Sequence, residues 1–338
     1  MRRVRVIIGL AVVGLSTSAC SGGSHVAAST SATSVRSTKP ATPSSSAPSA
    51  AATTRHTAAQ RRVDPLTGGR LSRKPVIAVK LENTQAAMPQ IGLSRADLVF
   101  VEEVEGGLTR LMPIYHSSFP KRIEPVRSAR STDISLLPMF GHPTLVYSGV
   151  ASQVRKRLKR APIRLDDSGT RDPSRVAPHN LYFNLARVAR QSPHGKPKSI
   201  GLDFAKTDPR LHNALRRTHF TVRIGSDRFS FAYKGSRYLP SWNGRPYTDS
   251  SAKRHRVTAN NVLVLKVREV SDGYRDPAGT PVYRSVSTGS GVLALYRNGK
   301  KLSGTWHRAA ANKPFRLKGK DGKQLLLSPG KTWILLQP

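Results

Sequence analysis

Cysteine and acidic residues are scarce in this chain of 338 residues. Its 1 cysteine excludes a disulfide framework and a zinc site built from several cysteines. Only 19 aspartates and glutamates stand against 56 lysines and arginines, which gives a formal net charge of +37 at pH 7. This imbalance argues for an anionic partner or an anionic surface. Hydrophobic residues make up 38 %, too few for a polytopic membrane protein and enough for a packed core.

The N-terminus has the pattern of an export signal. The basic segment 1–5 precedes the apolar run 6–15, whose length at about 1.5 Å per residue covers roughly half of a ~30 Å hydrocarbon core. The run is therefore interpreted as the core of a signal peptide. Small residues and Cys20 follow, which resembles a bacterial lipoprotein signal, although Thr17 stands where leucine is usual. The resemblance implies that 1–19 is removed and that Cys20 carries a diacylglycerol, with palmitate among its acyl chains. Ordinary signal peptidase cleavage before the cysteine is the alternative.

The range 20–62 is rich in Ser, Ala, Thr and Pro and contains no aromatic residue and no acid. Such a segment cannot bury enough apolar surface to offset its ordering entropy, so it predicts a disordered linker between the anchor and a folded region. After residue 62 the chain contains 48 of the 56 basic residues and all 19 acids. The basic excess therefore belongs to the folded region.

The range 64–205 alternates apolar runs with amphipathic segments, which predicts a three-layer α/β domain. The predicted strands are 75–81, 98–107, 108–116 and 144–149. The predicted helices are 134–140, a basic helix at 152–160, and one that carries Leu181, Leu185 and Val188 on one face.

The range 219–338 predicts a smaller, strand-rich α+β domain, joined to the first by 193–218. The expected strands are 219–224 and 228–233, 261–267, 291–297 and 300–307 around Asn298-Gly299, and a final pair 324–327 and 332–336. Tyr238, Trp242 and Tyr247 lie in a predicted loop. They would either stack on sugar rings or form an aromatic cluster that closes the domain.

Six motifs, in order along the chain, resemble the DUF3048 family, also called YerB-like lipoproteins. They are Glu102 to Arg110, Glu124 to Asp133, Arg175 to Tyr182, Ala259 to Val262, Gly289 to Gly291 with Gly304 to Trp306, and Ser328 to Trp333. The resemblance covers about 64–338 and implies a lipid anchor, an N-terminal α/β domain, a smaller C-terminal domain and no established activity. Glu124 and Ser131 depart from the family pattern, which usually has glycine and proline there.

A candidate binding site is predicted from the arginines of these motifs. Arg110, Arg127 and Arg130 are expected to make bidentate contacts with an anion. The residues expected to orient them or to bind hydroxyl groups are Glu103, Glu105, His179 and Asn180. Strand alternation predicts Glu103 and Glu105 on one side of their strand. In the plainer alternative, the carboxylates only neutralise the arginines in a structural network.

Three functions are compatible with these residues. The first is an extracytoplasmic, membrane-anchored protein that binds an anionic cell-wall polymer or an acidic protein. The second is an envelope glycan or peptide hydrolase with Glu103 or Glu105 as acid or base and His179 as an assistant. The third is an assembly scaffold.

Other chemistries lack their motifs. The chain has no G-x-S-x-G, no phosphate-binding P-loop and no H-E-x-x-H. The remaining potential metal ligands, His116, His142, His179 and Glu103, lack a ligand spacing, so no metal and no cofactor is expected. The basic segment 154–160 could contact nucleic acid, but export argues against nucleic acid as a partner. A solvated face near anionic lipid is the simpler interpretation.

Overall fold

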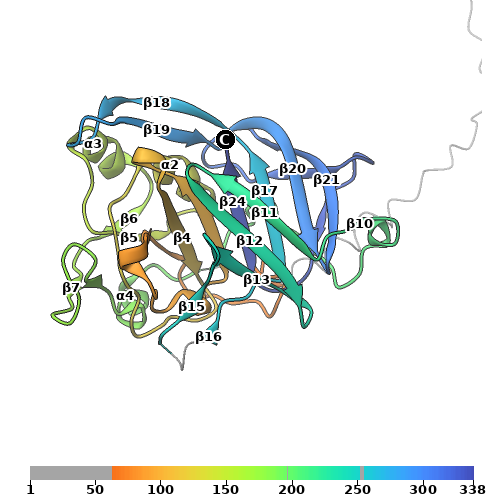
Figure 1. Ribbon diagram of the computed structural model, residues 1–338, viewed down its shortest axis with the longest axis horizontal. Helices are drawn as coiled ribbons and strands as arrows, with labels where there is room; N and C mark the ends of the chain where they lie inside the picture. Colours follow the sequence, from red (N-terminus) through yellow and green to blue (C-terminus); the bar gives the residue numbers. More distant parts are fainter. Residues whose placement is uncertain (1–62, 196, 252–254) are drawn as a thin grey trace, which may run out of the picture. The chain divides into compact units, whose positions relative to one another are not determined.

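The computed structural model describes residues 63–195, 197–251 and 255–338 (Figure 1). The predicted signal peptide, Cys20 and the linker lie outside these residues. The described part is strand-rich and has few helices, as the bounds below show. Its α-helices are α2 (Ser131–Leu136), α3 (Ser152–Arg160) and α4 (Leu185–Gln191). Short 3-10 turns occur at η1 (Gln85–Ala87), η2 (Leu93–Arg95), η3 (Glu105–Gly107), η4 (Leu137–Phe140) and η5 (Pro209–Leu211).

A 12-stranded sheet organises the described part. In spatial order its main path is β10 (Leu215–Arg216), β21 (Lys300–Arg308), β20 (Gly289–Arg297), β17 (Asn261–Lys266), β24 (Thr332–Gln337), β3 (Leu98–Glu103), β4 (Thr109–Tyr115), β1 (Ile77–Val79), β5 (Thr144–Val146) and β6 (Arg164–Asp166). Off this path, β2 (Leu81–Asn83) pairs with β4, and β22 (Arg316–Gly319) pairs with β21.

The remaining strands form smaller sheets. One has 4 strands, β11 (His219–Ile224), β12 (Asp227–Lys234), β13 (Arg237–Trp242) and β14 (Arg245–Pro246). The two-stranded ribbons are β18 (Arg268–Arg275) with β19 (Pro281–Val286), β15 (Thr248–Asp249) with β16 (His255–Arg256), β9 (Asp203–Phe204) with β23 (Leu326–Leu327), and β7 (Thr170–Arg171) with β8 (Leu181–Tyr182).

Strand β24 joins the two predicted halves of the folded region. It pairs in parallel with β17 on one side and with β3 on the other, so that Thr332 lies opposite both Asn261 and Leu98. Strands from the ranges 64–205 and 219–338 therefore share one continuous sheet.

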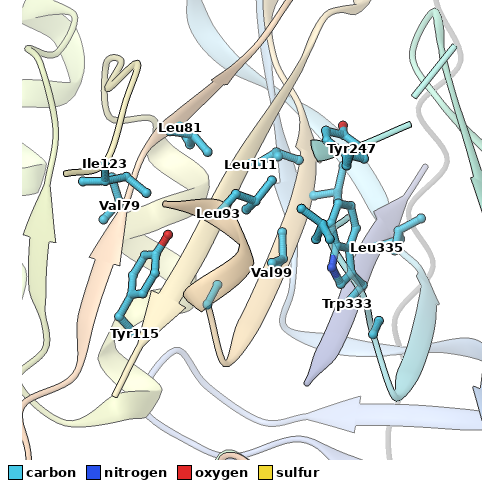
Figure 2. Packing of buried hydrophobic residues seen from close by; sticks show 14 of the residues in the cluster. Val79, Leu81, Leu93, Val99, Leu111, Tyr115, Ile123, Tyr247, Trp333 and Leu335 are labelled. Carbon is cyan, nitrogen blue, oxygen red and sulfur yellow. The ribbon is translucent and has the colours of Figure 1, made fainter. Parts of the chain in front are cut away.

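Both faces of the central strands of this sheet are covered, which explains why these strands are apolar at successive positions. On β24, Trp333 and Leu335 point into one hydrophobic cluster, while Ile334 points into the other. The first cluster lies between the large sheet and the sheet β11 to β14, which crosses in front of β17 and β24 in Figure 1. Figure 2 shows this packing, with the rings of Tyr247 and Trp333 adjacent at a centroid distance of 5.2 Å.

Helices cover both faces in the N-terminal half. Leu185 of α4 packs in the first cluster, whereas Leu136 of α2 and Leu158 of α3 pack in the second. The predicted basic helix 152–160 is confirmed by α3. None of the helices in the described ranges is long and apolar enough to cross a membrane.

Several local predictions were wrong. The runs 324–327 and 332–336 do not pair, because β23 pairs with β9 and β24 enters the centre of the large sheet. Leu181 is not helical, since it belongs to β8 and α4 begins at Leu185. The segment 75–81 is interrupted at Lys80, which separates β1 from β2.

The predicted aromatic loop is largely a strand hairpin, formed by β13 and β14. Tyr238 and Tyr247 are fully buried and Trp242 is 7 % exposed. These rings therefore form an aromatic cluster in the core, which is the second of the two alternatives. They are not available to stack on a sugar.

Candidate functional site

Three neighbouring strands bring alternating charges to one place in the sheet. Arg110 on β4 lies opposite Glu82 on β2 and opposite Glu102 on β3. Side chains directly opposite each other on paired strands project from the same face. The register therefore places one guanidinium between two carboxylate-bearing positions, at the ends of β2 and β3.

Arg110 is only 5 % exposed. Its Nη1 donates a hydrogen bond to the carbonyl oxygen of Thr109 at 3.0 Å, but its Nε has no hydrogen-bond partner within the described part of the chain. Burial lowers the pKa of Arg110 to about 10, with Glu82 opposing the shift. A buried donor without a partner carries a desolvation cost, so it is a natural point of contact for an acceptor.

Arg130 is held in place by a bidentate ion pair with Glu105. Its Nε lies 2.7 Å from Oε1, and its Nη2 donates to Oε2 at 2.8 Å. Its Nη1 donates to the carbonyl oxygens of Ser128 and Ala129, both at 3.1 Å. The guanidinium of Arg130 is therefore satisfied by protein groups, and Glu105 is neutralised.

A buried network of ion pairs holds the backbone at Arg130 in place. Lys80, which is fully buried, donates to Glu102 and, at 2.9 Å, to Asp133. The other oxygen of Asp133 accepts from the backbone N–H of Arg130 at 2.7 Å, at the start of α2. Burial lowers the pKa of Lys80, and Asp133 opposes the shift. The network thus connects the core of the sheet to the backbone that carries Arg130.

Arg127 and His179 meet at Glu82. His179 Nδ1 lies 2.8 Å from one carboxylate oxygen of Glu82, and Arg127 Nε lies 3.7 Å from the other. Nη1 of Arg127 also donates to the carbonyl oxygen of Pro178 at 3.1 Å. Since Glu82 is opposite Arg110, this group continues the same cluster of charges.

A pocket of about 730 Å³ opens beside Arg110 and Arg130. Glu105, Ser128, the first residues of α3 and the end of β18 also line it. The hydroxyl of Tyr274, on β18, is buried without a hydrogen-bond partner among the described residues. We name this cavity the Arg110 pocket. Its volume lies within the range typical of small-molecule sites.

The ribbon β18–β19 positions Tyr274 through a buried aspartate. Asp272 accepts from Ser131 Oγ at 2.5 Å and from Arg157 Nη2 at 3.0 Å. These bonds tie the ribbon to the start of α2, at Ser131, and to Arg157 in the second half of α3. The wall of the pocket contributed by the C-terminal half is therefore fixed to the N-terminal half.

Glu103 and Asn180 lie away from the Arg110 pocket. Glu103 is opposite Thr109 and lies next to Gly225 in the β11–β12 turn, where burial raises its pKa. It separates from Glu105 because β3 ends at Glu103 and the turn η3 interrupts the strand alternation. Asn180 accepts from Arg171 at 2.7 Å and donates to the carbonyl oxygen of Asp172 at 3.2 Å.

Two residues near the pocket, Lys80 and Tyr274, were not predicted from the sequence as part of the site. Lys80 gave a usable signal, because a lysine inside an apolar run is rarely buried unless it is paired. Tyr274 gave no such signal, since it reaches the pocket from a ribbon far along the chain. Within the ranges described, no group of three or more His, Cys, Asp and Glu side chains is placed to hold a metal ion.

The fold and the pocket define a strand-rich protein with an arginine-lined cavity at the ends of its sheet strands. The chain belongs to the DUF3048 family. Residues 65–198 match the model described as "Protein of unknown function (DUF3048) N-terminal domain", and residues 218–334 match that of the DUF3048 C-terminal domain.

One curated relative is "Putative lipoprotein YerB" of Bacillus subtilis, which is 28 % identical over 297 residues, 81 % of this chain and 86 % of the relative. The crystal structure of the YerB protein from Bacillus subtilis has a similar fold. Its TM-score is 0.67 at 24 % identity, and the match covers 82 % of this chain and 96 % of that one.

Proposed function

We propose that this protein is an envelope lipoprotein, anchored through Cys20 at the extracytoplasmic face of the membrane, and that its folded part binds an anionic group in the Arg110 pocket. The anionic group belongs to a cell-wall polymer or to an acidic partner protein. The signal-like segment before Cys20 and the lipoprotein name of the YerB relative support the anchor. The family has no known function, so the proposal that the pocket binds an anion is argued from the geometry of the pocket alone.

The buried, unpartnered Nε of Arg110 is the observation that carries the proposal. Arg130 is occupied by Glu105, and Arg275, which also lines the pocket, is exposed to solvent. Arg110 is therefore the buried cationic donor of the pocket with unused hydrogen-bonding capacity. Charge-assisted hydrogen bonds to carboxylate or phosphate are about twice as strong as neutral ones. An anion here would satisfy a donor that already bears the cost of burial.

Two further groups favour an anion. The helix α3 begins at Ser152 beside the pocket, and a helix N-terminus carries a partial positive charge. The Tyr274 hydroxyl can donate an additional hydrogen bond. Neither group alone would be enough to bind an anion, but both lie on the walls of the pocket that Arg110 lines.

Retention on purified cell-wall material, followed over a salt titration, tests the pocket. Full-length protein carrying Cys20→Ser is the reference, because this change removes the thiol alone. We expect Arg110→Met to lower the apparent affinity at least tenfold at low salt, since it removes the guanidinium and keeps an apolar side chain about as long as the aliphatic stem of arginine. Arg155→Met, on the exposed side of α3, removes the same charge elsewhere and is expected to change affinity less than twofold.

Equal retention of the Arg110→Met and Arg155→Met proteins would contradict the proposal. If Arg110→Met does not fold, Tyr274→Phe provides the second measurement, because it deletes only a hydroxyl from the ribbon wall. We expect it to weaken retention severalfold, and an unchanged affinity in this variant would also count against the pocket.

Labelling with palmitate tests the anchor. We expect the native chain, expressed in a bacterium that processes lipoproteins, to incorporate the label and to sediment with membranes. Cys20→Ser is expected to abolish labelling and to release the protein from the membrane fraction, whereas Ser21→Ala should do neither. Absence of label in the native chain, or label that persists after Cys20→Ser, would contradict attachment at this residue.

A further inference from the structure

A second cavity lies on the opposite half of the large sheet, and it shares no lining residue with the Arg110 pocket. The sheet β11 to β14 covers one face of β17 and β24 but leaves the same face of β20 and β21 partly open (Figure 1). The open part forms a groove of about 720 Å³ along edge strand β11. We call it the β20 groove.

The floor of the β20 groove is apolar along β20 and β17, and hydroxyl side chains of β21 adjoin it. Val292, Ala294 and Tyr296 alternate along β20 and lie on one face, with Val264 opposite Ala294 on β17. Val292 is 59 % exposed, an unusual degree for a valine on a sheet strand. Val222 of β11 forms the facing wall. The groove therefore offers an elongated apolar strip to the solvent.

The rim of the groove is basic. Lys301, Lys318 and Lys320 line it. Their side-chain ammonium groups form no hydrogen bond or ion pair with any residue that the structure describes, and that of Lys301 lies 6.0 Å from the centre of the Tyr296 ring. Lys266 also lines the groove, but it donates to the carbonyl oxygen of Pro338. No acidic residue is present among the lining residues. An occupant with an apolar body and an anionic end would complement both features.

We propose that the β20 groove binds one acyl chain of an anionic lipid, with the lipid phosphate between the lysines of the rim. Burial of methylene groups on the valine floor supplies the driving force. Attraction of anionic headgroups by clustered lysines supplies the selectivity. A polypeptide strand added to the edge of β11 would use backbone hydrogen bonds instead and would not require this basic rim.

Calorimetry with two single-chain lipids tests this proposal. Lysophosphatidylglycerol and lysophosphatidylcholine of the same chain length are titrated, below their micelle concentrations, into full-length protein carrying Cys20→Ser. We expect saturable binding of one anionic lipid with an association constant on the order of 10⁴ M⁻¹, and at least fivefold weaker binding of the zwitterionic lipid.

Two matched pairs of variants locate the site. Val292→Glu places a charge on the floor and is expected to lower affinity at least tenfold, whereas Val176→Glu, at a valine that is 80 % exposed, should leave it unchanged. Lys318→Glu with Lys320→Glu should remove the preference for the anionic lipid. The same double change at Lys156 and Lys159, on the exposed side of α3, should preserve it.

Equal affinities of the Val292→Glu and Val176→Glu proteins would overturn the site, and equal binding of the two lipids would overturn the role of the rim. A photoreactive phenylalanine derivative at position 292, activated in cells, identifies the occupant. A lipid adduct supports the proposal, and a protein adduct refutes it in favour of strand addition to β11. Because Arg110 is not involved, these outcomes are independent of the result for the Arg110 pocket.

Discussion

Replacing Lys80 by methionine is expected to lower the free energy of unfolding by about 3–5 kcal/mol. Lys80 is fully buried and is paired with Glu102 and Asp133, whose side chains are also buried. Methionine preserves most of the volume but removes the cation, so two carboxylates would remain in the core without their partner. Chemical unfolding by urea, followed by tryptophan fluorescence, measures the change.

A double variant distinguishes the loss of charge from the loss of packing. Lys80→Met combined with Glu102→Gln removes the cation together with one carboxylate, and we expect it to recover at least a third of the lost stability. Lys156→Met, on the exposed side of α3, is the matched control and should change stability by less than about 0.5 kcal/mol. A loss below about 1 kcal/mol for Lys80→Met would show that the buried network does not stabilise the sheet.

The same network explains how the core and the Arg110 pocket depend on each other. One carboxylate oxygen of Asp133 accepts a hydrogen bond from the Lys80 ammonium, and the other accepts one from the backbone N–H of Arg130. Loss of Lys80 should therefore also disturb the start of α2, from which Arg130 reaches Glu105. Weakened retention of Lys80→Met on cell-wall material would be a consequence of this connection and would not mark Lys80 as a ligand contact.

Local signals in the sequence predicted local structure well. The Asn298-Gly299 turn joins β20 to β21, and the alternation after His219 gives the β11–β12 hairpin. The pairing of strands that lie far apart in the sequence was harder to predict. The run 332–336 follows 324–327 after a Ser-Pro-Gly turn, which favoured a hairpin, yet β24 is apolar on both faces because it is a central parallel strand. Period-two patterns specify a strand but do not specify its neighbours.

The same limit applies to the site. Arg110, Arg130 and Glu105 line one pocket, and the motif that contains Arg110 and Glu105 could suggest their proximity because it is continuous. Glu103 could not be separated from Glu105 without knowing that the strand ends between them. Tyr274 belongs to a ribbon that docks on α2 through a buried carboxylate and through a backbone hydrogen bond of β19, and no local pattern encodes these contacts.

The stability of the protein should also depend on pH through Glu269, on β18. Burial and the nearby charge of Glu103 raise the pKa of Glu269 from 4.5 to about 7, and its Oε1 has no hydrogen-bond partner in the ranges described. Between these two pH values the folded state holds a proton that the unfolded state releases, so stability falls as pH rises through this window. The shift corresponds to roughly 3 kcal/mol, and partial solvent exposure reduces this to about 2 kcal/mol.

Glu269→Gln should remove most of this dependence, because glutamine carries no charge at any pH. We expect the variant to be about 2 kcal/mol more stable than the native sequence at pH 8 and close to it at pH 4.5. Asp167→Asn, which removes an exposed carboxylate, should follow the native profile. Unfolding curves collected at half-unit steps from pH 4.5 to 8 make the comparison. Parallel profiles for the native and Glu269→Gln proteins would mean that Glu269 is charged throughout this range, and that the pair Glu103 and Glu269 is solvated more fully than its burial implies.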